Sequence, residues 1–409
     1  MQSERLIEKL NNKLAFVRKS ALKELKKRER FDHSLIPNQN LHEVNMNIHT
    51  NYSFSPYSPT LASYMAYKSG IKIASACDFG TICATSEFKN ACSYLNISTL
   101  SAFEVTLVSK QRGEGIYSFY GINSNAESAF LPMLEDFRKA CYMRVSKVCE
   151  KINLKLKKFD LIVDFEKEVC KKVNTANGAT LTLKHLYMAT SEKIIEKFAK
   201  GKAIADFLRN TLCLDIEEGS YNLLCDANNP FYVYDLISAL RRNFNSVESG
   251  VTPPALDDYL SVALKNSCIV AYEYEAPNNW LKNQAESEKT IADFEMALKS
   301  LKQEGINAVT ISNNNLGEKI VEEFIKKAQQ NEMLVIFNKR TEYPRDHFES
   351  PAPESSKAYL EKCAYAMLGN YLSTLTNVDD GLFTQKTLSK VSSFEQRLNI
   401  YYQIGKTQL

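Results

Sequence analysis

Three residues that can bind a metal ion occur in the first part of the chain: His49, Asp78 and Glu104. We expect each at the C-terminal end of a strand, in the order of the apolar runs VNMNI, IKIASACD and ISTLSAFEVTLVS. In a parallel α/β sheet or barrel such strand ends meet on one side and carry the active groups. The spacing therefore predicts a metal site, although each residue alone could be a hydrogen-bonded core group or a helix cap.

The strand pattern that positions these residues is interrupted and then resumes. Helical segments alternate with strand-like runs up to about residue 125, and further strand-like runs follow at 267–276, 306–312 and 333–339. Residues 126–215 are rich in Lys, Leu and Glu at helical spacing, with LIVDF as an isolated strand signal. The pattern predicts an α/β barrel with a helical insertion.

Four units follow from this pattern. They are an N-terminal helical arm and linker (1–44), the first part of the barrel (45–125), a helical insertion (126–260), and the remainder of the barrel with C-terminal helices (261–409).

The N-terminal residues 3–30 have apolar side chains near 3.6-residue spacing and end in a basic run, which predicts an amphipathic helix or helix pair. The linker FDHSLIPNQN comes next. Lys and Glu alternate around the polar face, which favours a helical arm packed on its own domain over a helix lying on a membrane.

Composition restricts the partners and the compartment. The 51 basic and 48 acidic residues leave a net charge of +3, too balanced to indicate nucleic acid or an anionic membrane as the main partner. The ten cysteines show no regular pairing, as expected for reduced thiols. We find no signal-peptide pattern and no apolar run of about 18 residues, so we expect a cytoplasmic protein.

A family resemblance becomes specific over the segment NIHTNYSFSPYSPTLASYMAYKSGIKIASACDFGTICATSEFKNACSYLNISTLSAFEV. It resembles the N-terminal half of the polymerase and histidinol phosphatase (PHP) superfamily, whose motifs run His-x-His, Asp-His and Gly-x-Glu. TLTLKHLYMAT, NNPFYVYDLI, IVAYEYEA and VIFNKRTEYPR resemble later segments of that family. The resemblance implies an α/β fold, a distorted (β/α)7 barrel, that holds up to three zinc, manganese or iron ions and hydrolyses phosphate esters.

Matched residue by residue, the resemblance implies four metal ligands: His49, Asp78, Glu104 and His185.

Three other ligand positions of the family pattern are occupied by residues that bind metals poorly or not at all. Asn51 replaces the second histidine, Phe79 replaces the histidine of Asp-His, and Arg340 aligns with a ligand aspartate. A neutral amide is a poor zinc ligand, a phenyl ring is none, and a guanidinium stays protonated. A cluster of metals is therefore not expected. The sequence predicts one divalent metal (zinc, manganese or iron) or none.

Arg340 suggests a specific hypothesis about the site. Its guanidinium could occupy the former metal space and pair with Asp78 or Glu104, because carboxylates buried without a cation would repel one another. Alternatively, Arg340 points to solvent. Arg340 and Arg345 are also the candidates for binding a phosphate group.

Two classes of function remain open on the sequence. In one, the chain is an active metal-dependent phosphoesterase with a rewired, mononuclear site. In the other, which we favour, it is a catalytically impaired or non-catalytic relative that uses the barrel pocket for binding, because several ligand positions have become non-ligating. The partner would be a phosphorylated small molecule or a protein, and fold resemblance alone does not decide between these classes.

Overall fold

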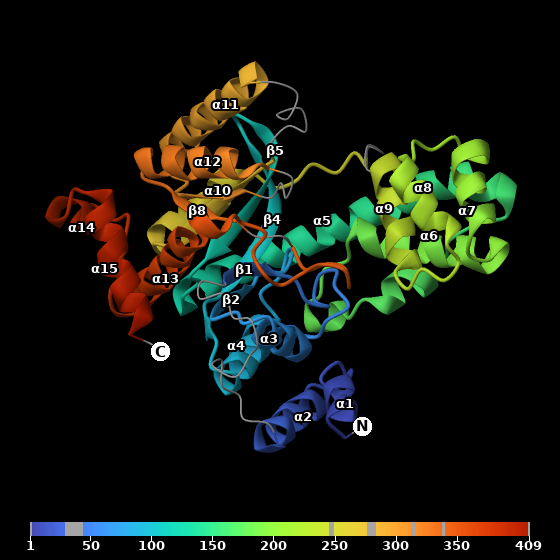
Figure 1. Cartoon of the computed structure of the whole chain (residues 1–409), viewed down its shortest axis with the longest axis horizontal. Coiled ribbons are helices and arrows are strands. Elements are labelled where there is room, and N and C mark those ends of the chain that lie inside the picture. The colour runs from blue at the N-terminus through green and yellow to red at the C-terminus, as the bar shows by residue number, and fades with distance from the viewer. Residues whose placement is uncertain are drawn as a thin grey trace.

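The computed structural model describes residues 2–28, 44–244, 249–275, 284–311, 316–337 and 340–407. Figure 1 shows a mixed α/β body and, beside it, a lobe made of helices, with the long helix α5 leading from one to the other. The expected mixed α/β class is confirmed.

The first sheet is parallel, with the order β1-β2-β3, and its strands are β1 (Val44–Ile48), β2 (Ile73–Ala76) and β3 (Ser98–Thr99). Helices α3 (Pro59–Lys68) and α4 (Thr85–Tyr94) form the crossovers between these strands. All residues of β1 and β2 are buried, as expected for strands covered on both faces.

The second sheet has the order β4-β5-β6-β7-β8: β4 (Ala102–Ser109), β5 (Gly113–Tyr120), β6 (Ile269–Tyr274), β7 (Ala308–Ile311) and β8 (Leu334–Ile336). β5 pairs antiparallel with both β4 and β6, whereas β6, β7 and β8 are parallel. The sequence pattern identified β6, β7 and β8 but not β5. It also joined β3 and β4 into one strand, whereas the chain changes sheets between them.

Helices cover this second sheet: α10 (Leu256–Lys265), α11 (Gln284–Gln303) and α12 (Glu318–Gln330). The rings of Phe294 and Phe324 stack at 4.0 Å between α11 and α12. At the C-terminal end lie α13 (Glu354–Thr376), α14 (Gln385–Lys390) and α15 (Phe394–Lys406). Helices α13 and α15 approach so closely that a Cβ on Gly369 would lie 1.9 Å from the carbonyl oxygen of Tyr401.

The insertion is helical, as its sequence pattern indicated. Its helices are α5 (Ser124–Leu156), α6 (Leu183–Phe198), α7 (Lys202–Asp206), α8 (Glu218–Cys225) and α9 (Tyr232–Phe244), and they enclose a hydrophobic cluster of their own. The segment LIVDF is no strand. Its first four residues have no regular secondary structure, and a π-helical turn begins at Phe165.

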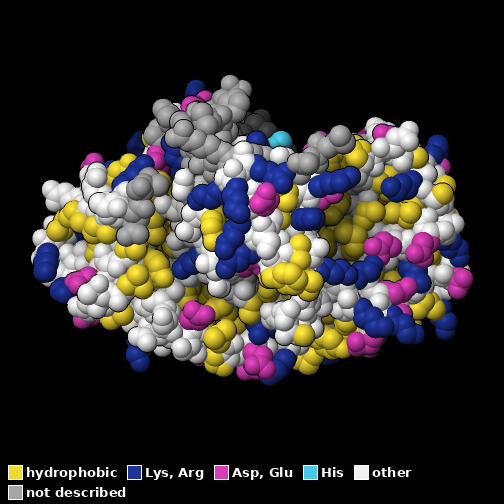
Figure 2. Space-filling view, turned by 90° about the horizontal axis from the view of Figure 1, so that it is seen from below, with side chains coloured by type: hydrophobic (Ala, Val, Ile, Leu, Met, Phe, Trp, Pro, Cys, Tyr) yellow, Lys and Arg dark blue, Asp and Glu magenta, His cyan; other side chains and the backbone are white. Residues whose placement is uncertain are grey.

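The N-terminal residues form a helix pair, α1 (Gln2–Lys9) and α2 (Ala15–Arg28). The buried Arg18 of α2 pairs with Glu87 of α4, with Nε 2.7 Å from Oε1. This ion pair holds the N-terminal helix pair against α4, one of the crossover helices of the first sheet. Figure 2 shows Lys and Arg side chains gathered on the face where these helices lie. The predicted linker FDHSLIPNQN lies outside the described residues. No described helix is long and apolar enough to span a membrane.

Candidate functional site

The two sheets meet at Asp78 and Glu104. The N–H of Glu104 donates to the carbonyl of Asp78 at 3.1 Å, and the N–H of Gly80 donates to the carbonyl of Glu104 at 2.6 Å. Glu104 is the third residue of β4, not the end of a strand, so its position follows from the change of sheet after Thr99. His49 directly follows β1. The fold therefore brings the three residues of the predicted cluster into one region.

The carboxylate of Asp78 is fully engaged by the loop that follows β1. It accepts the backbone N–H of Thr50 at 2.7 Å, the hydroxyl of Thr50 at 2.7 Å and the hydroxyl of Ser53 at 2.6 Å. Burial raises the pKa of Asp78, and these hydrogen bonds oppose the rise. Asp78 thereby fixes the loop that carries His49.

Both ring nitrogens of His49 have neighbours at hydrogen-bond distance. Nδ1 lies 3.2 Å from Ser53 Oγ, and Nε2 lies 3.1 Å from Asn47 Oδ1. The carboxylates of Glu104 and Glu342 are more distant, at 3.9 Å from Nε2 and 3.8 Å from Nδ1. Burial lowers the pKa of His49 to about 3. The imidazole is therefore neutral at physiological pH.

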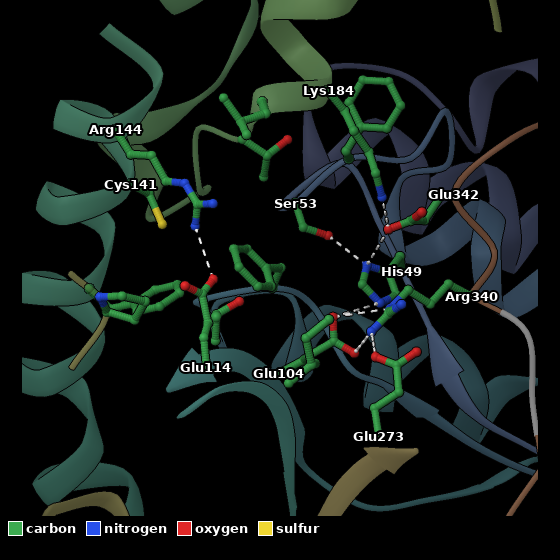
Figure 3. A pocket seen from close by; sticks show the side chains of 18 of the residues that line it. His49, Ser53, Glu104, Glu114, Cys141, Arg144, Lys184, Glu273, Arg340 and Glu342 are labelled. Carbon is green, nitrogen blue, oxygen red and sulfur yellow. Dashed lines mark hydrogen bonds and ion pairs between the residues drawn. The ribbon is translucent and has the colours of Figure 1, made fainter. Parts of the chain in front are cut away.

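Arg340 reaches into the site and binds two carboxylates (Figure 3). Its Nε lies 3.1 Å from each oxygen of Glu104, its Nη2 lies 2.8 Å from Glu104 Oε2, and Nη2 also pairs with Glu273 of β6. Its side chain is only 19% exposed. Of the two partners that the sequence left open, Asp78 and Glu104, the one that pairs with Arg340 is Glu104, and the alternative of a solvent-directed Arg340 is wrong.

This ion pair determines the charge of the region. Burial raises the pKa of Glu104, and the Arg340 guanidinium opposes that rise. Burial alone would lower the pKa of Arg340, but Glu104 and Glu273 raise it well above its ordinary value. The short contacts between the Arg340 N–H groups and both oxygens of Glu104 are typical of a guanidinium bound to an ionised carboxylate.

A second ion pair connects the insertion to the same region. Lys184, in the first turn of α6, pairs with Glu342, two residues beyond Arg340. Burial raises the pKa of Glu342, but the positive charges of Lys184 and Arg340 oppose that rise, and the pKa is lowered to about 2. Glu342 is therefore ionised and partnered.

The other predicted site residues have different surroundings. His185 caps the start of α6: its Nδ1 accepts the N–H of Thr182 at 3.1 Å, and its ring packs on Phe54 at 5.1 Å. Arg345 binds Asp235 of α9 at 2.8 Å and Asn229 at 3.0 Å. Neither side chain is among those that line the cavity described next.

A cavity of about 750 Å³ opens above Arg340 between the second sheet and the insertion. Its charged floor consists of Glu104, Glu273, Glu342, Arg340 and Lys184, and we call this set the acidic floor. Aromatic side chains such as Phe54, Phe79 and Tyr272 line the sides. This size and mixture of apolar walls with a few polar groups are typical of small-molecule sites.

The described residues contain no group of three or more His, Cys, Asp or Glu side chains placed to hold a metal ion. The contacts explain this finding. The oxygens of Asp78 accept bonds from Thr50 and Ser53, both nitrogens of His49 have partners, and Glu104 binds Arg340. A divalent metal would have to displace these partners, so the arrangement seen does not fit one.

Sequence reasoning missed four residues of this site: Ser53, Lys184, Glu273 and Glu342. Glu273 had a usable signal, because it lies near the end of a predicted strand, as His49 and Asp78 do. Ser53 and Lys184 had none, since their roles depend on contacts between distant segments.

Comparison with known proteins supports the architecture. The chain resembles a protein from Bifidobacterium adolescentis, provisionally assigned as a metal-dependent phosphoesterase, with a TM-score of 0.50 at 13% identity, over 78% of this chain and 96% of that one. An amidohydrolase from Chromobacterium violaceum gives 0.49 at 12% identity, over 76% and 92%. No family model and no curated protein matches the sequence. At this identity the likeness shows the fold alone.

Proposed function

We propose that this chain is a PHP-like protein that does not hydrolyse phosphate esters and uses its cavity to bind a ligand. In this proposal the two sheets form a distorted barrel of the PHP type, and Arg340 serves as its resident cation. The observation that carries the proposal is the contact of one guanidinium with both Glu104 and Glu273 at the floor of the cavity.

The charges around Glu104 support a site without metal. A divalent cation beside Glu104 would lie next to a guanidinium that cannot lose its proton, and the two positive charges would repel. The Arg340 side chain satisfies the same carboxylates without metal, which removes the repulsion between Glu104 and Glu273.

The remaining groups offer little for activating water. A general base works best with a pKa near the operating pH, whereas burial lowers the pKa of His49 to about 3. Asp78 is buried and already accepts three hydrogen bonds. Binding without turnover therefore agrees with the chemistry of these side chains, and the ligand class we propose is a phosphorylated small molecule.

Metal content and turnover test the proposal together. The protein is purified without a histidine tag, dialysed against zinc or manganese, passed through a desalting column and examined by elemental analysis. The same samples are assayed with p-nitrophenyl phosphate. We expect far less than one metal ion per chain, and no hydrolysis above that of a His49→Ala variant. Stoichiometric metal that disappears in His49→Ala, together with turnover, would overturn the proposal.

One observation favours the second candidate, a mononuclear metal-dependent phosphoesterase. His49 Nε2 and Glu104 Oε1 are 3.9 Å apart, and both residues line the cavity. This candidate requires Arg340 to move away from Glu104. An Arg340→Ser variant separates the cases: a gain of stoichiometric zinc only in that variant would mean that Arg340 excludes the metal in the native chain.

A further inference from the structure

A second group of cations lies on the side of the cavity formed by the insertion. Arg144 of α5 and Arg241 of α9 both line the cavity, together with Tyr187 of α6 and Tyr343 of the loop after β8. We call these four residues the basic wall. In Figure 3, Arg144 lies across the cavity from Arg340, whereas Tyr343 lies next to the acidic floor, with Lys184 Nζ 5.9 Å from the centre of its ring.

The hydroxyls of the basic wall lack partners. Tyr187 is fully buried, and neither its hydroxyl nor the buried hydroxyl of Tyr343 has a hydrogen-bond partner among the described residues. Burial raises the pKa of Tyr187 to about 12, and the charges of Arg241 and Arg144, which line the same cavity, oppose that rise. Buried polar groups in folded proteins are normally hydrogen-bonded, so an unpartnered pair needs an explanation.

The cations of the basic wall are also weakly neutralised. Arg241 is exposed and has no carboxylate at ion-pair distance in the described part of the chain, whereas its neighbour Arg242 pairs with Glu217 at 2.5 Å. Arg144 has a partner, Glu114, but at 3.5 Å and with side chains 34% and 50% exposed. Exposed pairs of this kind add little, so both guanidiniums can bind another anion.

The acidic floor has the opposite preference. Its three carboxylates face two cations, Arg340 and Lys184, and both cations are already paired. The excess negative charge disfavours an anion at the floor and favours a ligand group that donates hydrogen bonds, such as a hydroxyl or an amine.

We propose that the cavity binds a small molecule by an anionic group, a phosphate in the first instance, held by Arg144 and Arg241 with the hydroxyls of Tyr187 and Tyr343. Hydroxyl or amino groups at the other end of the molecule donate to the carboxylates of the acidic floor. This inference rests on the proposed binding function and adds an orientation: the phosphate lies away from His49 and Glu104, where hydrolysis would require it.

Titration with inorganic phosphate tests the inference on the full chain, by isothermal calorimetry at low ionic strength. We expect saturable binding that weakens at least about tenfold in Arg241→Gln, since a charge-assisted hydrogen bond is lost, and about threefold or more in Tyr343→Phe. Arg242→Gln, one residue along the same helix, is the matched control and should bind phosphate as the native chain does. Melting temperatures verify that each variant is folded.

A floor variant distinguishes the two orientations. Glu273→Gln removes one negative charge beside Arg340 and should change phosphate affinity by less than about twofold if phosphate binds the basic wall. Tighter binding in Glu273→Gln with no effect of Arg241→Gln would place phosphate at Arg340 and overturn the inference while leaving the binding function intact. Absence of saturable binding would also overturn it. Phosphate binding that requires added zinc, with turnover, would instead contradict the proposed function.

Discussion

Replacing Arg340 by alanine should destabilise the protein through the carboxylates it leaves behind. Glu104 is only 3% exposed and Glu273 12% exposed, and both lose their cation. Removing one partner of a buried ion pair costs about 3 to 5 kcal/mol. Because the cavity above Arg340 admits water, we expect the lower end, about 3 kcal/mol in the free energy of unfolding at pH 8.

The loss should depend on pH. In Arg340→Ala, burial and Glu273 raise the pKa of Glu104 in the folded state, and no cation opposes them. A carboxyl group whose pKa is raised by folding contributes stability at low pH and loses it as the pH rises through the folded-state pKa. The variant should therefore approach the native chain in stability at pH 5 and differ most at pH 8.

Urea unfolding followed by circular dichroism at pH 5 and pH 8 measures both effects. The double variant Arg340→Ala with Glu104→Gln should recover at least half of the loss at pH 8, since a neutral amide needs no cation. Arg345→Ala is the control: its exposed pair with Asp235 should contribute no more than about 1 kcal/mol. An Arg340→Ala variant as stable as the native chain at pH 8 would refute the internal-cation argument.

Three further outcomes follow from the contacts described. Burial lowers the pKa values of His49 and His185 to about 3, so both should stay neutral in the folded state. The free energy of unfolding should therefore fall by about 2 kcal/mol for each histidine as the pH falls from 7.5 to 5, because the unfolded chain binds the protons. NMR should show two imidazoles that do not titrate in that range. Asp78→Ala should cost about 3 kcal/mol by urea unfolding, with or without zinc, because three donors lose their acceptor. Gly369→Ala should lower stability by about 3 kcal/mol in thermal unfolding, because the new methyl group would overlap α15.

Each of these outcomes has its own control or contradiction. A histidine signal titrating near pH 6.5 for His49 would contradict the burial argument. If Asp78→Ala lowered the free energy of unfolding only in the presence of zinc, Asp78 would be a metal ligand and not the residue that holds the loop after β1. Gly219 is the matched glycine, because a methyl group added there would meet no other atom within 4 Å: Gly219→Ala in α8 should leave stability unchanged or raise it by up to about 1 kcal/mol.

The sequence was most informative where periodicity is local. The buried runs of β1 and β2 and the helices of the insertion follow from patterns that a short window contains. The sequence did not indicate β5, because the first half of this strand is exposed or half-buried and carries two glycines, which leaves no continuous apolar signal. Its pairing with β4 and β6 defines it, and such pairing involves residues that are distant in sequence.

The site was predictable to the extent that strand ends locate side chains. His49, Asp78 and Glu104 come together, and charge predicted that Arg340 would pair with one of the two carboxylates, Asp78 or Glu104. Which group satisfies each carboxylate was not predictable. Thr50 and Ser53 donate hydrogen bonds to Asp78 because the loop after β1 folds back on itself. No residue type or spacing in the sequence predicted that turn.

The bonds around Asp78 bear on how related sequences should be interpreted. Its carboxylate holds the loop after β1, while its carbonyl and the backbone of Glu104 join the two sheets. Both contacts are structural, so folding alone is a reason to keep an aspartate at this position whether or not the site binds a metal. In searches across genomes, an Asp at this position is therefore weak evidence of catalysis on its own.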